Sequence, residues 1–353
     1  MKSEKRGSVG SGADARRWND WRWQLRHAVR GDSPVLKAFG VEPRGAARVH
    51  RRYPVFLTPY ALAQLRLNSP SDPLNLQALP SLSELVPERG MVADPFRETS
   101  RAACCYGLKQ RFPDRVLVMA CGVCAMACRH CTRKGLLKGA EVVRTAAQTA
   151  AAVDWVRAHP AVREVLLSGG DPLLLSDARL LALVRAFARL PQIDAVRIGT
   201  RVPVTLPMRV TETLARRLGT FKKVWVNTQF NHARELTPEA AAACARLVEA
   251  GIPVSNQSVL LRGVNDSADA LFELCAALQR NRVRPYYVFL CDPIAGIAHF
   301  RVPLCRAREI ERELAVRLGG LALPRFVADV PGSPRKVPLS EYSDRRTIGR
   351  AAE

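Results

Sequence analysis

No stretch of the 353-residue sequence approaches the run of about 18 apolar residues that a membrane-spanning helix requires. The first residues, MKSEKRGSVGSGADARRW, carry charges but lack the apolar core of a secretory signal. The first absence excludes a membrane-spanning helix. With the second, it leads us to expect a cytoplasmic protein without membrane association.

Acidic residues are also few, since 32 Asp and Glu stand against 54 Lys and Arg and leave a formal net charge of +22. Such a surplus attracts phosphate, which makes nucleic acid a partner to consider. The arginines are spread from Arg16 to Arg350 instead of forming one basic block, as is typical of solvated faces. We therefore do not expect nucleic acid as the partner.

Ten cysteines and 48% hydrophobic residues describe a chain that can bury a sizeable core. Disulfide scaffolds belong to short secreted domains, and this chain is long. The composition therefore favours reduced thiols, some of them bound to metal.

The chain divides into four predicted regions: a disordered tail over 1–15, a helical N-terminal region over 16–110, a regular α/β region over 111–340 and a charged C-terminal tail over 341–353. Strand-like and helix-like runs alternate in the third region, which indicates parallel βαβ units. Six such units fit a partial (β/α)6 barrel, with its chemistry on the loops after the strands. The strands are expected at 116–120, 162–167, 195–198, 223–227, 253–260 and 283–290, and the helices at 144–158, 177–189, 237–250, 266–280 and 306–318.

The loop after the first expected strand holds three closely spaced cysteines, Cys124, Cys128 and Cys131. Three thiolates on one short loop can bind three irons of a 4Fe-4S cluster and leave the fourth iron open to a small molecule. A structural zinc site that also uses Cys121 and His130 is the alternative. Closed zinc sites usually draw on a second, distant pair of ligands, and the sequence contains no later CxxC or HxxxH.

The cysteine spacing resembles the signature of the radical S-adenosylmethionine (SAM) enzymes, and the longer string CAMACRHCTR resembles the lysine 2,3-aminomutases within that superfamily. The resemblance extends in the family's order over roughly residues 16–340. It includes WNDWRWQ from Trp18, RFPDRV from Arg111, LSGGDP from Leu167, RIGTR from Arg197, NQSVLLRGVND from Asn256 and RPYY from Arg284.

The resemblance implies a radical SAM barrel with three cofactors: the 4Fe-4S cluster on Cys124, Cys128 and Cys131, SAM, and pyridoxal 5′-phosphate (PLP). Its motifs imply SAM contacts from a glycine-rich segment and from Gln257. Lys336 matches the lysine that binds PLP covalently, and Arg111 and Arg115 match PLP contacts. The glycine-rich segment consists of Ser168, Gly169, Gly170 and Asp171.

Three further residues match the family's substrate contacts. Arg133 matches the arginine that binds the substrate α-carboxylate, a task suited to the guanidinium fork. Asp292 and Asp329 match two carboxylates that hold the distant ammonium group of lysine. The resemblance therefore implies an isomerase that interconverts L-lysine and β-lysine and receives electrons from a flavodoxin or ferredoxin.

Three departures from the family pattern limit what can be carried over. The cysteine-bearing tail that holds a zinc between family subunits has no counterpart in this sequence, and Ser267 replaces its partner cysteine. Neither the zinc site nor the tetramer is therefore carried over, and a homo-oligomer stays open. Gln229 replaces an expected histidine and Phe112 a tyrosine. Cys121 is an additional thiol, which we interpret as a small apolar residue at a strand end.

Alternative functions remain open at this stage. The same chemistry could act on another basic amino acid, or could supply β-lysine for the modification of an elongation factor. From other classes, a radical SAM enzyme that modifies RNA and a binding protein that has lost turnover are also compatible with the motifs.

Overall fold

The computed structural model describes residues 12–31, 33–96, 98, 107–136 and 144–343. Short helices and one small sheet form the N-terminal part, and several helices begin with Pro in the first turn behind a capping side chain, as at Glu42, Thr58 and Asp72. These elements are α1 (Gly12–Asn19), α2 (Trp21–Arg26), β1 (Val29–Arg30), η1 (Pro34–Phe39), α3 (Pro43–Arg52), β2 (Phe56–Leu57), α4 (Pro59–Ala63), α5 (Pro73–Ala78) and η2 (Leu82–Leu85).

A nine-stranded sheet follows, in the spatial order β11-β10-β9-β8-β7-β6-β5-β4-β3. All neighbours from β4 to β10 are parallel, and an antiparallel strand lies at each edge. The strands are β3 (Leu108–Phe112), β4 (Arg115–Cys121), β5 (Glu164–Gly169), β6 (Ala195–Gly199), β7 (Val224–Thr228), β8 (Val254–Leu260), β9 (Arg284–Leu290), β10 (Arg325–Ala328) and β11 (Val337–Pro338).

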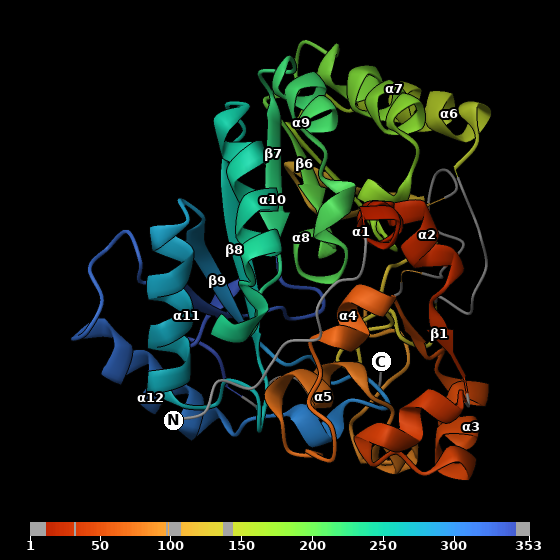
Figure 1. The fold of residues 1–353 in the computed structure, drawn as a ribbon. Helices are drawn as coiled ribbons and strands as arrows, with labels where there is room; N and C mark the ends of the chain where they lie inside the picture. The colour runs from red at the N-terminus through yellow and green to blue at the C-terminus, as the bar shows by residue number, and fades with distance from the viewer. Residues whose placement is uncertain (1–11, 32, 97, 99–106, 137–143, 344–353) are drawn as a thin grey trace.

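A helix follows each of the six parallel strands from β4 to β9, and Figure 1 shows α9, α10 and α11 along the outer side of the strands. Most of these helices begin behind a Ser or Thr whose hydroxyl accepts a backbone hydrogen bond, as at Thr145, Thr211 and Ser267. The helices are α6 (Ala146–Arg157), α7 (Asp177–Ala188), α9 (Glu212–Gly219), α10 (Pro238–Glu249), α11 (Ala268–Arg280) and α12 (Leu304–Ala315), with α8 (Val202–Thr205), η3 (Pro172–Leu174), η4 (Pro207–Arg209), η5 (Ala233–Glu235) and η6 (Ala298–Phe300) in the loops.

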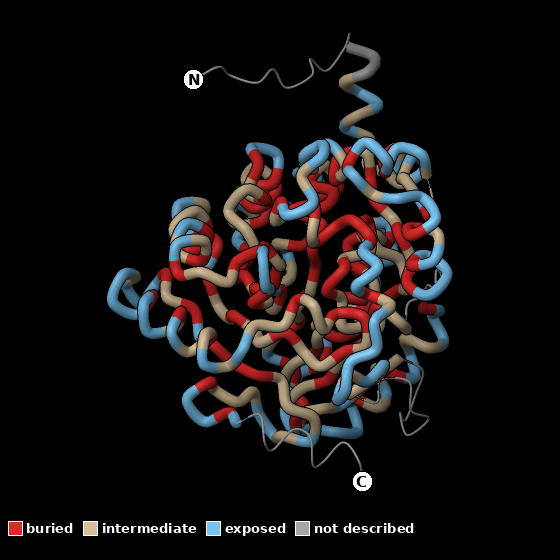
Figure 2. Tube along the Cα trace, turned by 90° about the horizontal axis from the view of Figure 1, so that it is seen from below, coloured by how far each residue is buried: buried red, intermediate tan, exposed pale blue. Residues whose placement is uncertain are grey.

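The two faces of the sheet differ in polarity. Val116, Val196 and Val226 belong to the apolar core between strands and helices and are fully or almost fully buried. Because side chains alternate along a strand, Trp225 lies on the opposite, inner face, where it is 43% exposed. The inner face is thus partly open to solvent, whereas Figure 2 shows the buried segments concentrated inside the molecule.

The two edges of the sheet meet through side chains. Arg111 on β3 donates to the carboxylate of Asp329, just after β10, with Nη2–Oδ1 at 2.7 Å and Nη1–Oδ2 at 3.2 Å. The sheet therefore curves until its first and last parts come into contact, although no backbone ladder among the described residues closes it. This is the partial barrel that the sequence predicts.

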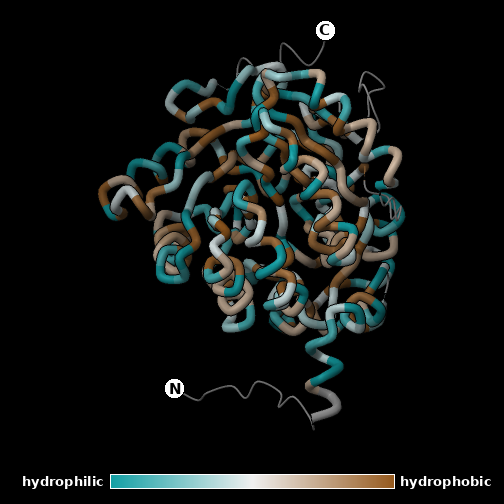
Figure 3. The backbone as a smooth tube through the Cα atoms, turned by 90° about the horizontal axis from the view of Figure 1, so that it is seen from above, coloured by the Kyte–Doolittle hydropathy of each residue, from teal (hydrophilic) through white to brown (hydrophobic). Residues whose placement is uncertain are grey.

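The predicted α/β fold is confirmed, with two elements added in the barrel region. Helix α9 was not expected, and β10 adds a seventh parallel strand beyond the six predicted. Strand β3 lies partly within the region assigned to the helical part. Helix α1 begins at Gly12, inside the predicted tail, and projects from the body in Figures 2 and 3; residues 1–11 and 344–353 lie outside the described residues.

No helix in the described residues is both long enough and apolar enough to cross a membrane.

Candidate active site

The cysteine loop lies at the carboxyl end of β4, beneath the N-terminal helices. Ala127 donates its backbone N–H to Phe56 at 2.9 Å, and Arg129 donates its backbone N–H to Gln77 at 2.9 Å. The N-terminal part of the chain therefore covers the loop and fixes its path.

The three predicted cluster cysteines gather on this loop, and all three are partly exposed thiols. Burial and the neighbouring thiols raise the pKa of Cys124 well above its ordinary value, and burial followed by Cys128 raises the pKa of Cys131. In the described residues no three His, Cys, Asp or Glu side chains form a single-ion site. Three neighbouring thiols on one loop fit three irons of a larger cluster.

Cys121, at the end of β4, is buried and points elsewhere. Its Sγ donates to the backbone oxygen of Asp171 at 3.2 Å, and burial raises its pKa to about 11. Both observations agree with the interpretation of Cys121 as a small structural residue.

A buried ionic cluster supports the loop. Glu84 accepts from the guanidinium of Arg129 and pairs with Lys134, whose Nζ lies 2.6 Å from Glu84 Oε2 and donates to the backbone oxygen of Gly296 at 2.9 Å. Burial lowers the pKa of Lys134 to about 8, although the Glu84 charge opposes that shift. A residue between the second and third cysteines and a residue after the third are thus anchored to distant parts of the chain.

The glycine-rich segment at the end of β5 packs directly against the cysteine loop. Gly170 donates its backbone N–H to Cys121 at 2.6 Å, and a Cβ on Gly170 would lie 2.2 Å from the Val123 oxygen. Gly169 has φ +118°, and a Cβ there would lie 2.4 Å from the Cys121 oxygen. Only glycine permits this approach.

Asp171 is buried and its carboxylate is fully engaged. It accepts from the Thr200 hydroxyl at 2.7 Å and from the backbone N–H groups of Leu173, Arg201 and Val202 at 2.7 to 3.1 Å. Asp171 therefore ties the ends of β5 and β6 together, and its direct contact with SAM stays a prediction, as does that of Ser168.

Arg201 is a site residue to which the sequence assigned no role, although the RIGTR motif contains it. Its Nη1 lies 2.9 Å from the Cys128 sulfur, and its Nη2 donates to Glu235 at 2.7 Å and to Gln77 at 2.6 Å. Burial acts to lower the pKa of Arg201, but the charges of Cys128 and Glu235 raise it overall. A fixed positive charge thus adjoins one of the predicted iron ligands.

Gln257 lies on β8 at a register shift, opposite Tyr287 on β9. Its side chain is partly exposed and makes no hydrogen bond within the described part of the chain. The neighbouring Asn256, by contrast, is buried and bonded to both backbone groups of Phe230. An amide on the inner face with free donors is suited to a ligand, and the SAM contact of Gln257 stays a prediction.

The predicted PLP lysine and both predicted substrate carboxylates converge near the barrel edge. Lys336 Nζ lies 3.4 Å from Asp329 Oδ2 and 4.3 Å from the centre of the Phe289 ring. Burial lowers the pKa of Lys336, although Asp329 opposes the shift. Burial and the charge of Asp329 raise the pKa of Asp292 to about 8, while Arg111 and Lys336 moderate it.

The two predicted PLP arginines differ in their surroundings. Arg111 is bound to Asp329, as described above, whereas Arg115 pairs with its neighbour Asp114, Nε–Oδ1 at 2.8 Å. Arg197, another arginine of the inner face, pairs with Glu164 and lies close enough to Lys336 to lower its pKa. The PLP roles of Arg111 and Arg115 stay predictions.

Arg133, the predicted carboxylate-binding residue, is engaged by a residue that the sequence did not reveal. Its Nε and Nη2 donate to the two oxygens of Glu98 at 2.6 and 2.8 Å, and its Nη1 contacts Ser168 Oγ at 3.2 Å. Burial acts to lower the pKa of Arg133, but the charge and hydrogen bonds of Glu98 raise it overall.

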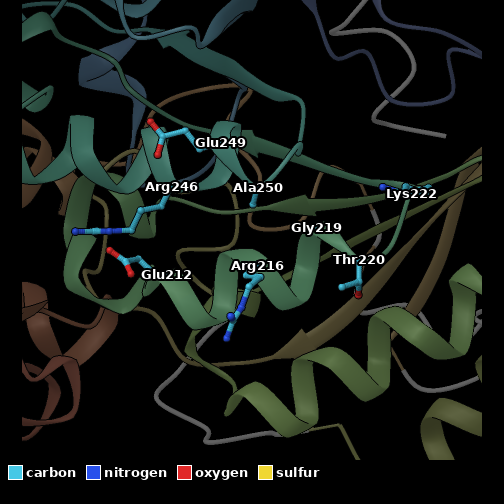
Figure 4. Close-up of a pocket in the computed structure, with 8 residues that line it drawn as sticks. All are labelled: Glu212, Arg216, Gly219, Thr220, Lys222, Arg246, Glu249 and Ala250. Atoms are coloured by element: carbon cyan, nitrogen blue, oxygen red, sulfur yellow. The ribbon is translucent and has the colours of Figure 1, made fainter.

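A separate surface pocket lies between α9 and α10, as Figure 4 shows. It includes the last residues of both helices, which lead into β7 and β8, so it lies at the amino ends of these strands. The cysteine loop and the glycine-rich segment lie at the opposite, carboxyl ends of the strands. The pocket is lined by Glu212, Arg216, Gly219, Thr220, Lys222, Arg246, Glu249 and Ala250.

The sequence is similar to known proteins over most of its length. A model of the Radical SAM superfamily matches residues 119–275. The L-lysine 2,3-aminomutase of Clostridium subterminale is 40% identical over 325 residues, which cover 91% of this chain and 78% of that protein. The L-lysine 2,3-aminomutase of Escherichia coli (strain K12) is 34% identical over 326 residues, 91% of this chain and 94% of that protein.

The glutamate 2,3-aminomutase of Clostridioides difficile (strain 630) is 32% identical over 327 residues, 91% of this chain and 76% of that protein. Among solved structures, Streptococcus suis SuiB bound to S-adenosylmethionine aligns with a TM-score of 0.47 and 16% identity over 62% of this chain and 51% of that chain.

The superfamily match spans the cysteine loop and the strands around it, and together with the curated relatives it identifies the protein as a radical SAM enzyme with a 4Fe-4S cluster and SAM as cofactors. The relatives that match over nine-tenths of the chain narrow this class. The chain belongs to the lysine 2,3-aminomutase family, whose members are isomerases that also use PLP.

Proposed function

We propose that this chain interconverts L-lysine and β-lysine by migration of the α-amino group to the β-carbon. The observation that carries the proposal is the convergence of Asp292 and Asp329 beside Lys336. Two carboxylates next to a lysine suited to bind PLP are complementary to a substrate with a terminal ammonium group, although Arg111 also pairs with Asp329 in this structure.

Lys336 is proposed to hold PLP. Burial lowers its pKa, which increases the fraction of neutral amine available for covalent attachment, and aromatic rings of Phe112, Tyr287 and Phe289 surround its Nζ. When bound, the cluster and SAM supply a carbon-centred radical and PLP stabilises the migrating group. The protein supplies the binding, the orientation and the exclusion of water.

Cys124, Cys128 and Cys131 are proposed to ligate the cluster. The segment Ser168–Asp171 and Gln257 are proposed to contact or position SAM. The close packing of Gly169 and Gly170 against the cysteine loop supports this assignment, because it brings the end of β5 next to the backbone that leads into the three cysteines.

Arg133 is proposed to bind the α-carboxylate, and the Asp292–Asp329 pair the side-chain ammonium. A glutamate substrate would place its own carboxylate against this pair, and like charges at close range are unfavourable. Lysine is therefore favoured over the substrate named for the Clostridioides difficile relative.

As a radical SAM enzyme, the protein needs a reductant, and we propose a flavodoxin or ferredoxin type of donor. Such donors are small acidic proteins, and the formal charge of +22 would favour their association. A homo-oligomer and a cytoplasmic location stay predictions.

The test is an anaerobic assay of the reconstituted protein with L-lysine, in which β-lysine is quantified by chromatography. L-Glutamate and L-ornithine serve as competing substrates, and omission of SAM serves as the blank. Formation of β-lysine that depends on SAM and PLP supports the proposal. Turnover of glutamate equal to that of lysine would refute the lysine assignment and leave the radical chemistry in place.

A further inference from the structure

Glu98 forms the best-defined ion pair of the site, although it precedes the barrel. Its two carboxylate oxygens accept from Nε and Nη2 of Arg133 at 2.6 and 2.8 Å, which is the parallel two-bond geometry of a guanidinium and a carboxylate. The side chains of Arg133 and Glu98 are 13% and 8% exposed. The pair is therefore shielded from solvent, where such a bond is strong and directional.

The residues that precede Glu98 attach it to the other end of the site. The Glu98 N–H donates to Asp94 Oδ1 at 2.8 Å. Val92 exchanges backbone hydrogen bonds with the loop after β9 that carries Asp292, donating to Pro293 at 3.0 Å and accepting from Ala295 at 2.9 Å. Phe96 adds a ring 3.8 Å from the Arg111 guanidinium.

The guanidinium of Arg133 has five N–H donors, and Glu98 uses only the side-on fork of Nε and Nη2. Nη1 makes longer contacts, 3.2 Å to Ser168 Oγ and 3.4 Å to the Gly169 oxygen. One N–H of Nη2 has no acceptor among these contacts. The outer edge formed by Nη1 and Nη2 is therefore the part of the guanidinium that can receive a second carboxylate.

We propose that Glu98 is a positioning residue that holds the Arg133 guanidinium by its side-on fork and presents the Nη1–Nη2 edge to the α-carboxylate of the substrate. The inference rests on the proposed function, in which Arg133 binds that carboxylate. Without Glu98, the long side chain of Arg133 regains rotational freedom, and substrate binding must then restrict it.

Retention of Glu98 is favoured over its displacement by the substrate. Displacement would leave a carboxylate that is 8% exposed without its partner, and an unpaired buried charge is strongly unfavourable. The backbone of Glu98 is in addition fixed by Asp94. If Arg133 binds Glu98 and the substrate at the same time, both carboxylates are paired with the guanidinium.

The test compares wild type with E98Q, E98D and the control variant E88Q, all as reconstituted holoenzymes. Glu88 is an exposed glutamate that, like Glu98, precedes the barrel in the sequence. Its side chain has no partner in the described residues. Binding is measured by titration calorimetry with L-lysine, L-ornithine and L-glutamate and with L-lysinamide, which lacks the carboxylate. Steady-state KM and kcat are measured for the amino acid that wild type binds most tightly.

E98Q should raise the Kd and KM for that amino acid at least about tenfold, with kcat changed less than about threefold, because ground-state and transition-state binding are weakened alike. E98D should recover part of the loss, and E88Q should equal wild type. Binding of lysinamide should change little in E98Q, so that the preference for the free carboxylate falls. Equal iron content in all variants shows that the fold is intact.

A lower KM in E98Q would overturn the proposal, because it would show that Glu98 competes with the substrate. An unchanged KM, or equal weakening of lysine and lysinamide, would overturn it as well. Tighter binding of glutamate than of lysine by wild type would contradict the proposed function alone. Wild type and E98Q would then be compared with glutamate as the substrate, so the proposed role of Glu98 would still be tested. Binding of none of the amino acids would contradict both.

Discussion

The proposed ammonium site predicts a specific pH dependence. The pKa of Asp292 lies at about 8 because burial disfavours its charge and the neighbouring Asp329 repels it. Below that pH Asp292 is mostly protonated and uncharged, and above it Asp292 is mostly ionised. A lysine ammonium group is bound best when both carboxylates are ionised, so kcat/KM for lysine should rise with pH until the pair is fully charged.

The magnitude follows from a single titrating proton. Because the ionised fraction falls tenfold for each pH unit below the pKa, kcat/KM at pH 6 should be about one hundredth of its plateau. The kcat profile should be flatter, because bound lysine stabilises the ionised pair and lowers the pKa of Asp292 in the complex. The two profiles together distinguish an effect on free enzyme from one on chemistry.

The variant D329N gives the decisive comparison. It removes the repelling charge while keeping the shape of the side chain, so the pKa of Asp292 should fall and the rise in kcat/KM should move to lower pH. The plateau itself should be lower, since one carboxylate partner is lost. The assay is β-lysine formation from pH 6 to 9 in one buffer series, with D154N, on exposed helix α6, as control. A flat wild-type profile, or a D329N rise shifted upward, would refute the reasoning.

Three further predictions concern the cofactors and the substrate. Loss of any one of the three cluster cysteines, in Cys124→Ala, Cys128→Ala or Cys131→Ala, should abolish both the bound iron–sulfur cluster and SAM cleavage. The control Cys121→Ala should keep nearly full iron content. Equal iron loss in that control would contradict the three-ligand assignment. Borohydride treatment of the holoenzyme should fix PLP on the peptide that carries Lys336, and Lys336→Ala should lose amino migration but keep its cluster; a label on another lysine would exclude this role. Asp292→Ala and Asp329→Ala should each lose most activity on lysine, and wild-type kcat/KM for ornithine should be at least about tenfold below that for lysine, measured as product formed in parallel assays; full activity in both variants would argue against the paired carboxylates.

Much of the barrel could be predicted because its strands are apolar runs of ordinary length. The expected strand at 195–198 corresponds to β6, Ala195–Gly199, and the expected strand at 283–290 to β9, Arg284–Leu290. Helix α9 was missed because its eight residues include Glu212, Arg216 and Arg217 and few apolar positions. Strand β10 was missed because four residues carry too little periodicity to be distinguished from a loop.

The site could be predicted only as far as sequence motifs reach. The cysteine spacing identifies a cluster loop without any knowledge of the fold. The pairing of Arg111 with Asp329 joins residues 218 positions apart and depends on how far the sheet curves, which no local pattern records. Glu98 is a single glutamate in a proline-interrupted segment. It has a partner only because the fold places Arg133 next to it at the end of β5.

The division of labour along the chain follows from these positions. The superfamily match runs from residue 119 to residue 275, and it contains the three cysteines, the glycine-rich segment and Gln257. The residues proposed for PLP and for the ammonium group lie outside it, on β3 and at the start of β4 before the match and on the loops after β9 and β10. The residues proposed for SAM binding thus lie on or after the central strands, whereas the residues proposed for the substrate ammonium group lie on the flanking segments. Because Val92 and Glu98 connect the loop of Asp292 with Arg133, the segment before the barrel contacts both proposed ends of the substrate site and belongs functionally to the active site.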